Sequence, residues 1–302
     1  MIRQTTVSIG IPAFNEEGNI KGLLESLLKQ KSTPQFTLEK IYVVSDGSTD
    51  QTQKEVTSVN NAKIIYKDDK KRLGKSARLE EIFRLNTSDV LILLDADVFM
   101  SDTQLFSKLL KAVDFDRCGI VAINAKPFAS KTFFEEVLNT SVYTTKLIAQ
   151  QWNKGDNYLS FKGCFLALSG KFVKNLHIPK KLINNDAYLY FAAKKAGFGA
   201  TYVKNCTVYY KSPGTLVDHI LQSSRFQLSK QELGKYFSQG ELSYSPPIGI
   251  VFKSIIETIL KKPLYFVSYV GVHLLSKIQK QNADKPAWNI ADTTKQKFIP
   301  GN

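Results

Sequence analysis

The chain has 302 residues, of which 43% are hydrophobic and 23% are charged. This composition is typical of a globular protein with one or two domains and excludes a disordered, collagen-like or coiled-coil chain. Lys and Arg (41) outnumber Asp and Glu (27), which gives a formal net charge of +14. The whole excess lies in residues 121–302, which hold 24 basic and 10 acidic residues. This asymmetry indicates an anionic partner for the second part of the chain.

The type of basic residue narrows that partner. Of the 24 basic residues in 121–302, 23 are Lys and only Arg225 is Arg. Proteins that read nucleic acids favour the Arg fork, and no aromatic residues are interleaved with these lysines as a base-stacking surface requires. We therefore expect an anionic membrane surface and no nucleic acid.

Strand-like and helix-like patterns alternate over the first hundred residues. Short apolar runs predict four strands, at residues 7–11, 41–44, 63–66 and 90–94. Apolar residues at helical spacing predict helices at 20–28 and 75–85, and Asn15 is the predicted N-cap of the first helix. Buried strands separated by helices predict a mostly parallel sheet with helices on both faces. In such a sheet, ligands bind at the carboxyl ends of the strands.

The later elements follow a mixed pattern. Helices are predicted at 104–113, 132–152, 186–196 and 216–229, and strands at 119–124, 161–168 and 201–210. The segment Ser-Tyr-Ser-Pro-Pro at 243–247 marks a change of character. We expect residues 1–240 to form one domain with halves 1–120 and 121–240.

Two apolar segments, 250–260 and 264–278, follow this change on either side of Pro263. Neither reaches the roughly 18 uninterrupted apolar residues of a spanning helix. Residues 241–302 are therefore predicted to form amphipathic helices that lie in a membrane surface, or that pack as core helices on the domain. The polar tail from Gln279 is predicted to be mobile.

Polar residues follow each strand of the first half. The segment 12–16 follows the first strand, Asp46 the second, the basic loop 67–75 the third, and Asp95 with Asp97 the fourth. Two neighbouring carboxylates suit a hard divalent cation, and Gly74 beside Lys75 at a helix start suits phosphate. The phosphate-loop and dinucleotide-binding glycine patterns are both absent. The combination predicts a site for a metal–diphosphate complex.

Six segments in order then resemble one family. They are VSIGIPAFNEE (7–17), VVSDGSTD (43–50), RLGKSARL (72–79), LLDADV (93–98), NNDAYL (184–189) and QSSRF (222–226). Over roughly residues 5–230 the chain resembles family 2 glycosyltransferases, which have the GT-A fold, a Rossmann-like α/β architecture with a mixed, mostly parallel sheet. The chain departs from the family pattern at Ser45, Asn185 and Phe226, where the family commonly has Asp, an acidic residue and Trp.

The resemblance implies a role for each matching residue. Asp186 would be the catalytic base, and Asp97 with Asp95 would bind Mg²⁺ or Mn²⁺. The implied donor-sugar site consists of Pro12, Ala13, Phe14, Asn15, Glu16, Asp46, Arg72, Lys75, Asp95, Ala96, Gln222 and Arg225. The alternatives are that Asp186 is only a helix N-cap and that Arg225 is a surface helix residue.

The implied function is inverting, metal-dependent transfer of a sugar from a UDP- or GDP-sugar to a hydroxyl of a lipid-linked or growing glycan, as in polysaccharide synthesis. Transfer to a polyprenyl phosphate and non-catalytic binding of a nucleotide sugar are the alternatives. The three scattered cysteines form no disulfide pattern, and no signal-peptide pattern opens the chain. We expect a cytoplasmic protein that is peripheral on the cytoplasmic face of the membrane.

Overall fold

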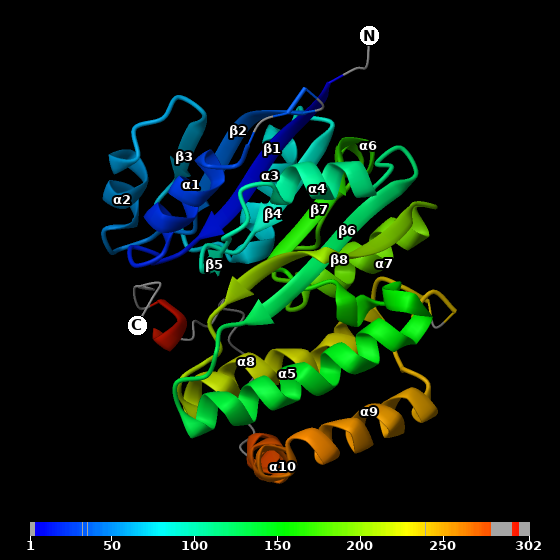
Figure 1. The fold of residues 1–302 in the computed structure, drawn as a ribbon. Coiled ribbons are helices and arrows are strands. Elements are labelled where there is room, and N and C mark those ends of the chain that lie inside the picture. The colour runs from blue at the N-terminus through cyan, green and yellow to red at the C-terminus, as the bar shows by residue number, and fades with distance from the viewer. Residues whose placement is uncertain (1–3, 32, 35, 239, 279–291, 296–302) are drawn as a thin grey trace.

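An eight-stranded mixed sheet forms the centre of the molecule (Figure 1). The structure is a computed structural model that describes residues 4–31, 33–34, 36–238, 240–278 and 292–295. The strand order in the sheet is β3-β2-β1-β4-β7-β6-β8-β5. The strands are β1 (Thr5–Ala13), β2 (Phe36–Ser45), β3 (Ile64–Asp68), β4 (Val90–Leu94), β5 (Val98–Phe99), β6 (Cys118–Pro127), β7 (Phe165–Ser169) and β8 (Gly199–Tyr210).

Helices cover both faces of this sheet and extend beyond it at one end. They are α1 (Ile20–Leu28), α2 (Thr52–Ser58), α3 (Lys75–Leu85), α4 (Leu105–Ala112), α5 (Phe133–Gln151), α6 (Gly170–Lys174), α7 (Asn185–Lys195), α8 (Leu216–Leu233), α9 (Ile248–Lys261) and α10 (Pro263–Ile278). Three short 3₁₀ helices are η1 (Trp152–Gly155), η2 (Tyr158–Ser160) and η3 (Asp292–Lys295).

The core has two apolar layers, one on each face of the sheet. Buried residues of α1, α2 and α4 pack on one face, against alternate residues of β1 such as Ile9 and Ile11. Residues of α3, α6 and α7 pack on the other, against Leu91 and Leu93 of β4. Because strand side chains alternate between faces, fully apolar runs such as β4 serve both layers. This arrangement confirms the predicted sheet with helices on both faces.

The directions of the strands determine where their carboxyl ends meet. The neighbouring strands β3, β2, β1 and β4 are all parallel, so their carboxyl ends lie at one edge of the sheet. The next strand, β7, runs antiparallel to β4 and β6, which makes the sheet mixed. The loops that follow β1, β2, β3 and β4 therefore converge, as the alternating pattern of the first hundred residues predicts.

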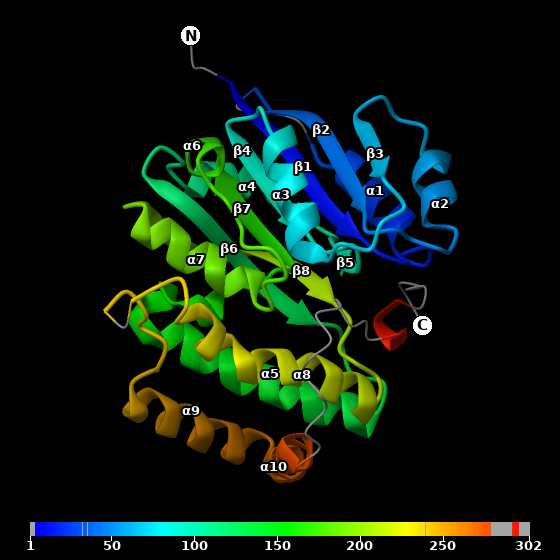
Figure 2. The same cartoon turned by 180° about the vertical axis from the view of Figure 1, so that it is seen from behind.

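The second half of the chain adds a helical layer. In Figures 1 and 2, α5 and α8 lie beyond the end of the sheet, and α9 and α10 form the outermost layer against them. Pro263 separates α9 from α10 as predicted, because α9 ends at Lys261 and α10 begins at Pro263. Most of the polar tail from Gln279, at 279–291 and 296–302, lies outside the described residues.

Some boundaries differ from the sequence predictions for local reasons. Asn15 is not the N-cap of the first helix, because α1 begins at Ile20 and Asn19 holds the cap position. Asn15 instead has a left-handed backbone (φ 52°), and its side chain accepts a hydrogen bond from the Thr49 amide at 2.8 Å. The strand predicted at 161–168 begins only at Phe165, because η2 and a turn precede it.

Candidate functional site

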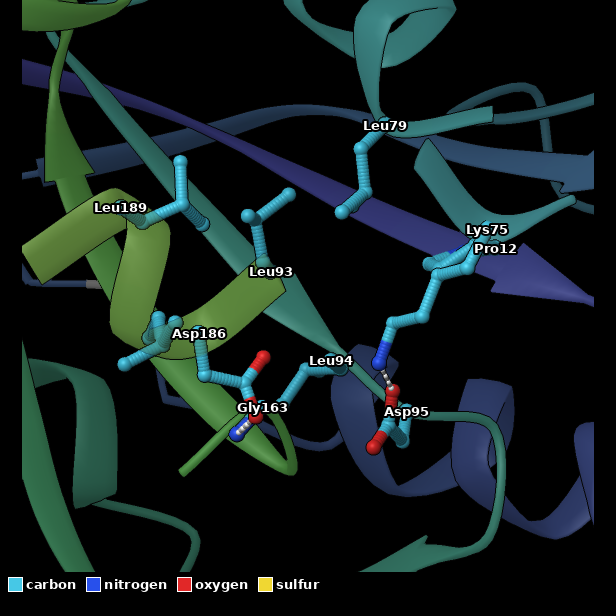
Figure 3. Close-up of a pocket in the computed structure, with 10 residues that line it drawn as sticks. Pro12, Lys75, Leu79, Leu93, Leu94, Asp95, Gly163, Asp186 and Leu189 are labelled. Atoms are coloured by element: carbon cyan, nitrogen blue, oxygen red, sulfur yellow. Dashed lines mark hydrogen bonds and ion pairs between the residues drawn. The ribbon is translucent and has the colours of Figure 1, made fainter. Parts of the chain in front are cut away.

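The site lies where the carboxyl ends of the parallel strands meet. Pro12 and Ala13 end β1, Asp46 follows β2, and Asp95 follows β4. Figure 3 shows Lys75 and Asp95 on one side of a hollow and Asp186 with Gly163 on the other. The hollow encloses about 230 Å³ of empty space, its open mouth included. It is lined by Pro12, Lys75, Leu79, Leu93, Leu94, Asp95, Gly163, Leu166, Asp186 and Leu189.

Asp46 is a fully buried carboxylate that holds the β3–α3 loop. Its Oδ1 accepts hydrogen bonds from the Leu73 amide (2.8 Å) and from Arg78 Nε (3.0 Å). Its Oδ2 accepts from Arg72 Nη1 at 2.6 Å, and the Gly74 amide lies within 3.1 Å of both oxygens. Asp46 therefore orders the loop that leads into α3, and it lies beside Arg72 at the nucleotide side of the predicted site.

Phe14 joins this group through its ring. The Arg72 guanidinium carbon lies 3.4 Å from the centroid of the Phe14 ring, a distance at which a cation–π interaction stabilises both side chains. Arg72 is thus directed to Asp46 and Phe14, while the Asp95 carboxylate is held by a different cation. The sequence prediction grouped Arg72 with Lys75 at one diphosphate, and the structure separates their contacts.

Lys75 and Asp95 form an ion pair at the edge of the hollow, with Nζ and Oδ1 2.5 Å apart. Lys75 is the first residue of α3, and Asp95 lies directly after β4. An ammonium group at the N-terminal end of a helix favours an anionic ligand. The predicted association of Lys75 with the Asp-x-Asp segment is present.

Acidic groups accumulate beside this pair. Burial and the negative charges of Glu16 and Asp95 raise the pKa of Asp97 to about 7. Burial also raises the pKa of Glu16, whose Oε1 receives Lys295 Nζ at 2.6 Å. Lys295 belongs to η3 and also donates to the Phe14 carbonyl. The acids of two strand ends thus repel one another, and a lysine from the far end of the chain offsets part of that charge.

These acids fit a divalent cation. Carboxylate oxygens are the ligands that Mg²⁺ and Mn²⁺ prefer, and the raised pKa of Asp97 shows that its surroundings disfavour a further negative charge without a cation. In the described part of the chain, no three His, Cys, Asp or Glu side chains could hold an ion by themselves.

Asp186 is held by a glycine rather than used as a cap. Asn184 is the N-cap of α7, and its side chain accepts from the Ala187 amide. Asp186 lies in the first turn, and its Oδ2 accepts from the Gly163 amide at 2.7 Å. A Cβ on Gly163 would lie 2.4 Å from Asp186 Oδ1. Only glycine at 163 allows this approach. The interpretation of Asp186 as the N-cap is wrong, because Asn184 holds the cap position.

The neighbours of Asp186 explain one departure from the family pattern. Asn185 is buried, accepts a hydrogen bond from Ser76 Oγ at 2.9 Å and donates to the Leu182 carbonyl. Asn185 thus connects the start of α3 to the start of α7. An acidic residue there would place a further charge in the interior, next to the carboxylate of Asp186.

The acids face a common interior. Burial, together with the charges of Asp95, Asp186 and Asp97, raises the pKa of the Cys164 thiol to about 12. Cys164 therefore lies among the carboxylates of both sides of the hollow, and its thiol stays protonated. None of the three cysteines forms a disulfide.

The predicted site residues include some that the structure places at the hollow and others whose side chains it does not describe. The structure brings Pro12, Lys75, Asp95 and Asp186 to one hollow, whereas the predicted roles of Gln222 and Arg225 stay predictions, because the side chains of 221–228 in α8 lie outside the described residues. Three residues went unpredicted: Arg78, Gly163 and Lys295. Arg78 had a signal, since it is a charged residue on the apolar face of α3 next to Leu79 and Ile82.

Comparison with known sequences gives one family. Residues 8–169, more than half of the chain, match glycosyl transferase family 2. The Bacillus subtilis (strain 168) protein named "Putative glycosyltransferase CsbB" is 28% identical over 115 residues. The match covers 37% of this chain and 34% of that protein, so the chain aligns with about a third of the length of this relative.

Solved structures show the same fold. The mannosyltransferase PcManGT from Pyrobaculum calidifontis, in complex with GDP-Man and Mn²⁺, has a TM-score of 0.56 at 16% identity, with 92% of this chain and 77% of that chain covered. Glucosyl-3-phosphoglycerate synthase from Mycobacterium tuberculosis, with Mn²⁺ and UDP-Glc, has a TM-score of 0.55 at 16% identity (75% and 78% covered). S. aureus TarS 1-349 with UDP-GlcNAc has a TM-score of 0.52 at 16% identity (78% and 73%). The predicted GT-A fold is confirmed.

The contact between Gly163 and Asp186 predicts a coupled pair. Gly163→Ala should lower the free energy of unfolding by about 1–2 kcal/mol, because the methyl group displaces the carboxylate and removes its hydrogen bond. In an Asp186→Ala background the same change should cost much less, since the methyl group then has room. Urea denaturation of the four proteins measures this coupling. Gly22→Ala, where a Cβ meets nothing within 4 Å, is the control; equal costs in both backgrounds would contradict the contact.

The raised pKa of Asp97 predicts a pH-dependent stability difference. Between an unfolded pKa near 4 and a folded pKa of about 7, the folded protein binds a proton that the unfolded chain lacks. This stabilisation is present at low pH and is lost as the pH rises through 7. Asp97→Asn should therefore differ least from the parent at pH 5 and be more stable than the parent at pH 8, by roughly 1–2 kcal/mol once solvent screening is allowed for.

Urea denaturation in EDTA at several pH values measures this difference. Asp114→Asn, at a carboxylate that is 62% exposed, is the matched control. A difference between Asp97→Asn and the parent that stays constant from pH 5 to pH 8 would refute the electrostatic account of Asp97.

Proposed function

Because the chain belongs to glycosyl transferase family 2, we propose that this glycosyltransferase moves a sugar from a UDP- or GDP-sugar to a hydroxyl of a lipid-linked or growing glycan, with inversion. The observation that carries this proposal is the hollow that Lys75 and Asp95 share with Asp186. One side offers a cation for a diphosphate, and the other offers a carboxylate for an acceptor.

The donor side suits a departing nucleoside diphosphate. Negative charge develops on the diphosphate as the bond to the sugar breaks, and preorganised cations stabilise that charge. Lys75 is held at a helix start with its ammonium group in the hollow. Asp97 and Asp95 would hold Mg²⁺ or Mn²⁺, which neutralises diphosphate charge when bound. The Phe14–Arg72 pair and the Asp46 loop form the neighbouring surface, on which we place the nucleotide.

The acceptor side suits a hydroxyl nucleophile. A hydroxyl group attacks effectively only when a base takes its proton. Asp186 Oδ2 accepts a hydrogen bond from the Gly163 amide, and this contact fixes the direction of the carboxylate. The same carboxylate lines the hollow. A single displacement on the face of the sugar opposite the diphosphate inverts the anomeric centre. Asp186 is thus the proposed base.

The outer helices support the proposal of a membrane surface. The side chains of α9 that face α5 are polar: Ser254 and Thr258 are fully buried, and Thr258 Oγ1 lies 3.0 Å from Thr144 Oγ1 of α5. Many apolar side chains of α9 and α10 are exposed instead. Those that are exposed are Ile248, Phe252, Ile256, Ile259, Leu260, Leu264, Val267, Val270, Leu274 and Leu275.

A helix pair with its polar side buried and its apolar side exposed is unfavourable in water. We propose that residues 241–302 place this face in the interfacial region of a membrane, with lysines such as Lys253 and Lys261 toward lipid phosphates. Within the described residues, the helices all fall short of the length and apolar character that a membrane crossing requires. The three unpaired cysteines and the lysine excess support the cytoplasmic face.

The donor site predicts selective binding of a nucleotide sugar. We expect one of UDP-, GDP- or dTDP-sugars to raise the melting temperature in the presence of Mn²⁺, and Lys75→Met to weaken that binding by about 10- to 100-fold, because a charge-assisted contact to phosphate is lost. Asp186→Asn should keep donor binding and lower turnover by at least about 100-fold. Calorimetry and a sugar-transfer assay with membrane lipids measure the two effects.

Three outcomes separate the alternatives. Failure of every nucleotide sugar to bind would overturn the donor site. Donor binding without transfer to any acceptor would favour a non-catalytic binding protein. Near-normal turnover of Asp186→Asn would favour transfer to a polyprenyl phosphate, since a phosphate is already ionised and needs no base.

The apolar face predicts binding to lipid vesicles. Phe252→Glu with Leu260→Glu should lower the affinity for phosphatidylcholine vesicles containing phosphatidylglycerol by at least about tenfold, because two exposed apolar side chains become charged. Leu73→Glu, at an exposed leucine of the β3–α3 loop, is the control in a sedimentation assay. Unchanged vesicle binding, or a dimer that dissociates in the double variant, would contradict the membrane assignment.

A further inference from the structure

A second hollow lies between α5, β6 and β8, in the half of the chain that carries the excess of lysine. It encloses about 290 Å³ of empty space with its mouth included. Its lining residues are Ile123, Ala125, Lys146, Ala149, Gln150, Leu159, Ser160, Lys162 and Tyr202. Two lysines, the hydroxyl groups of Ser160 and Tyr202 and the amide of Gln150 make it unlike an apolar packing defect.

Among the described residues, the lysines of this hollow have no acidic partner. Across the described ranges, neither Lys146 nor Lys162 forms an ion pair with a carboxylate. Lys146 Nζ donates to Asn124 Oδ1 at 2.5 Å, and Lys162 Nζ lies 6.0 Å from the centroid of the Tyr210 ring. Removing an ammonium group from water costs free energy unless an opposite charge compensates. This cost in free energy applies to both lysines of the hollow.

The surrounding charges add to the cost. Burial and the positive charges of Lys126, Lys162 and Lys204 lower the pKa of Lys146 to about 8. Burial also lowers the pKa of Lys162. An anion in the hollow would reverse both effects, because it stabilises the charged form of each lysine.

A buried hydroxyl group completes the set. Ser160 is 7% exposed, and its Oγ finds no hydrogen-bond partner among the residues that the structure describes. Buried polar atoms are nearly always hydrogen-bonded, so such an atom in a hollow indicates a ligand or a bound water. Ammonium and hydroxyl donors together are the groups that bind phosphate oxygens.

We propose that this hollow binds a phosphate group of the acceptor, through Lys146, Lys162 and Ser160 Oγ. The proposal rests on the proposed glycosyl transfer and adds the chemical class of the acceptor. Lys162 immediately precedes Gly163, whose amide holds Asp186. A phosphate at Lys162 would therefore fix an acceptor next to the carboxylate that takes its proton. Lipid phosphates and soluble phosphorylated acceptors share this chemistry.

Calorimetry with inorganic phosphate tests the site directly. Lys146→Met and Lys162→Met should each weaken binding by about 10- to 100-fold, and Ser160→Ala by a smaller factor. Lys174→Met, which removes the same charge from an exposed position of α6, should bind like the parent. Lys75→Met should also keep phosphate binding, because it alters only the donor hollow. Phosphate binding that depends on Lys75 and not on Lys146 and Lys162 would overturn the proposal.

Stability distinguishes a binding lysine from a structural one. Without phosphate, Lys146→Met should raise the melting temperature by about 2–4 °C, since it removes a half-buried charge that has no acidic partner among the described residues. Phosphate should raise the melting temperature of the parent and leave that of the variant unchanged. A lower melting temperature for Lys146→Met, with unchanged phosphate affinity, would show a structural lysine and overturn the site.

Two further measurements identify the source of the phosphate and separate this proposal from the proposed function. Weaker binding of Lys146→Met with Lys162→Met to phosphatidylcholine vesicles containing phosphatidic acid, relative to Lys174→Met, would identify a lipid phosphate; equal vesicle binding with lost inorganic-phosphate binding would identify a soluble acceptor. Both support the site. Donor binding is measured in parallel, so failure of the nucleotide sugars with an intact phosphate site refutes the proposed function alone.

Discussion

The buried carboxylate of Asp46 is the interaction on which the site depends. It is fully enclosed and receives Arg78, Arg72 and the amides of Leu73 and Gly74. Breaking a buried ion pair by removing one partner costs about 3–5 kcal/mol, so the loop between β3 and α3 has little freedom to leave this arrangement. Because that loop leads directly into α3, Asp46 also decides where the helix begins and where Lys75 emerges.

Charge balance then shapes the rest of the site. Burial raises the pKa of Glu16 and of Asp97, and the charge of Asp95 raises both further. The chain offsets these acids with Lys75 and Lys295. The strand ends beside Lys75 are therefore rich in acids whose charge lysines offset, whereas residues 121–302 hold 24 basic and 10 acidic residues. Asp186 lines the same hollow as Lys75 and Asp95, and the Gly163 amide holds its carboxylate.

Much of this arrangement could be predicted from the sequence. The apolar runs before Asp46 and Asp95 are buried parallel strands, and the rule that their carboxyl ends share one edge brings Pro12, Lys75 and Asp95 together. Arg78 is a charged residue on the apolar face of α3, and that contradiction is the signal by which it could be found. Gly163 and Lys295 carry no local pattern, since each matters only through a residue distant in the chain.

The outer helices show a different limit of sequence analysis. The apolar stripe of α9 indicates an amphipathic helix, and two interpretations follow from it, a core helix or a membrane helix. Periodicity cannot say which face packs. The structure buries Ser254 and Thr258 against α5 and leaves Phe252 and Leu260 exposed, which is the reverse of core packing.

The ion pair between Glu16 and Lys295 joins residues separated by 279 positions. On a ribosome that adds about 5–20 residues per second, Lys295 is made roughly 15–60 s after Glu16. The strands β1, β2 and β4 are all synthesised well before Lys295. Until Lys295 is made, the acids beside these strands lack this lysine. The edge formed by these strand ends is thus the first part of the sheet to be translated and the last to gain its full set of charges.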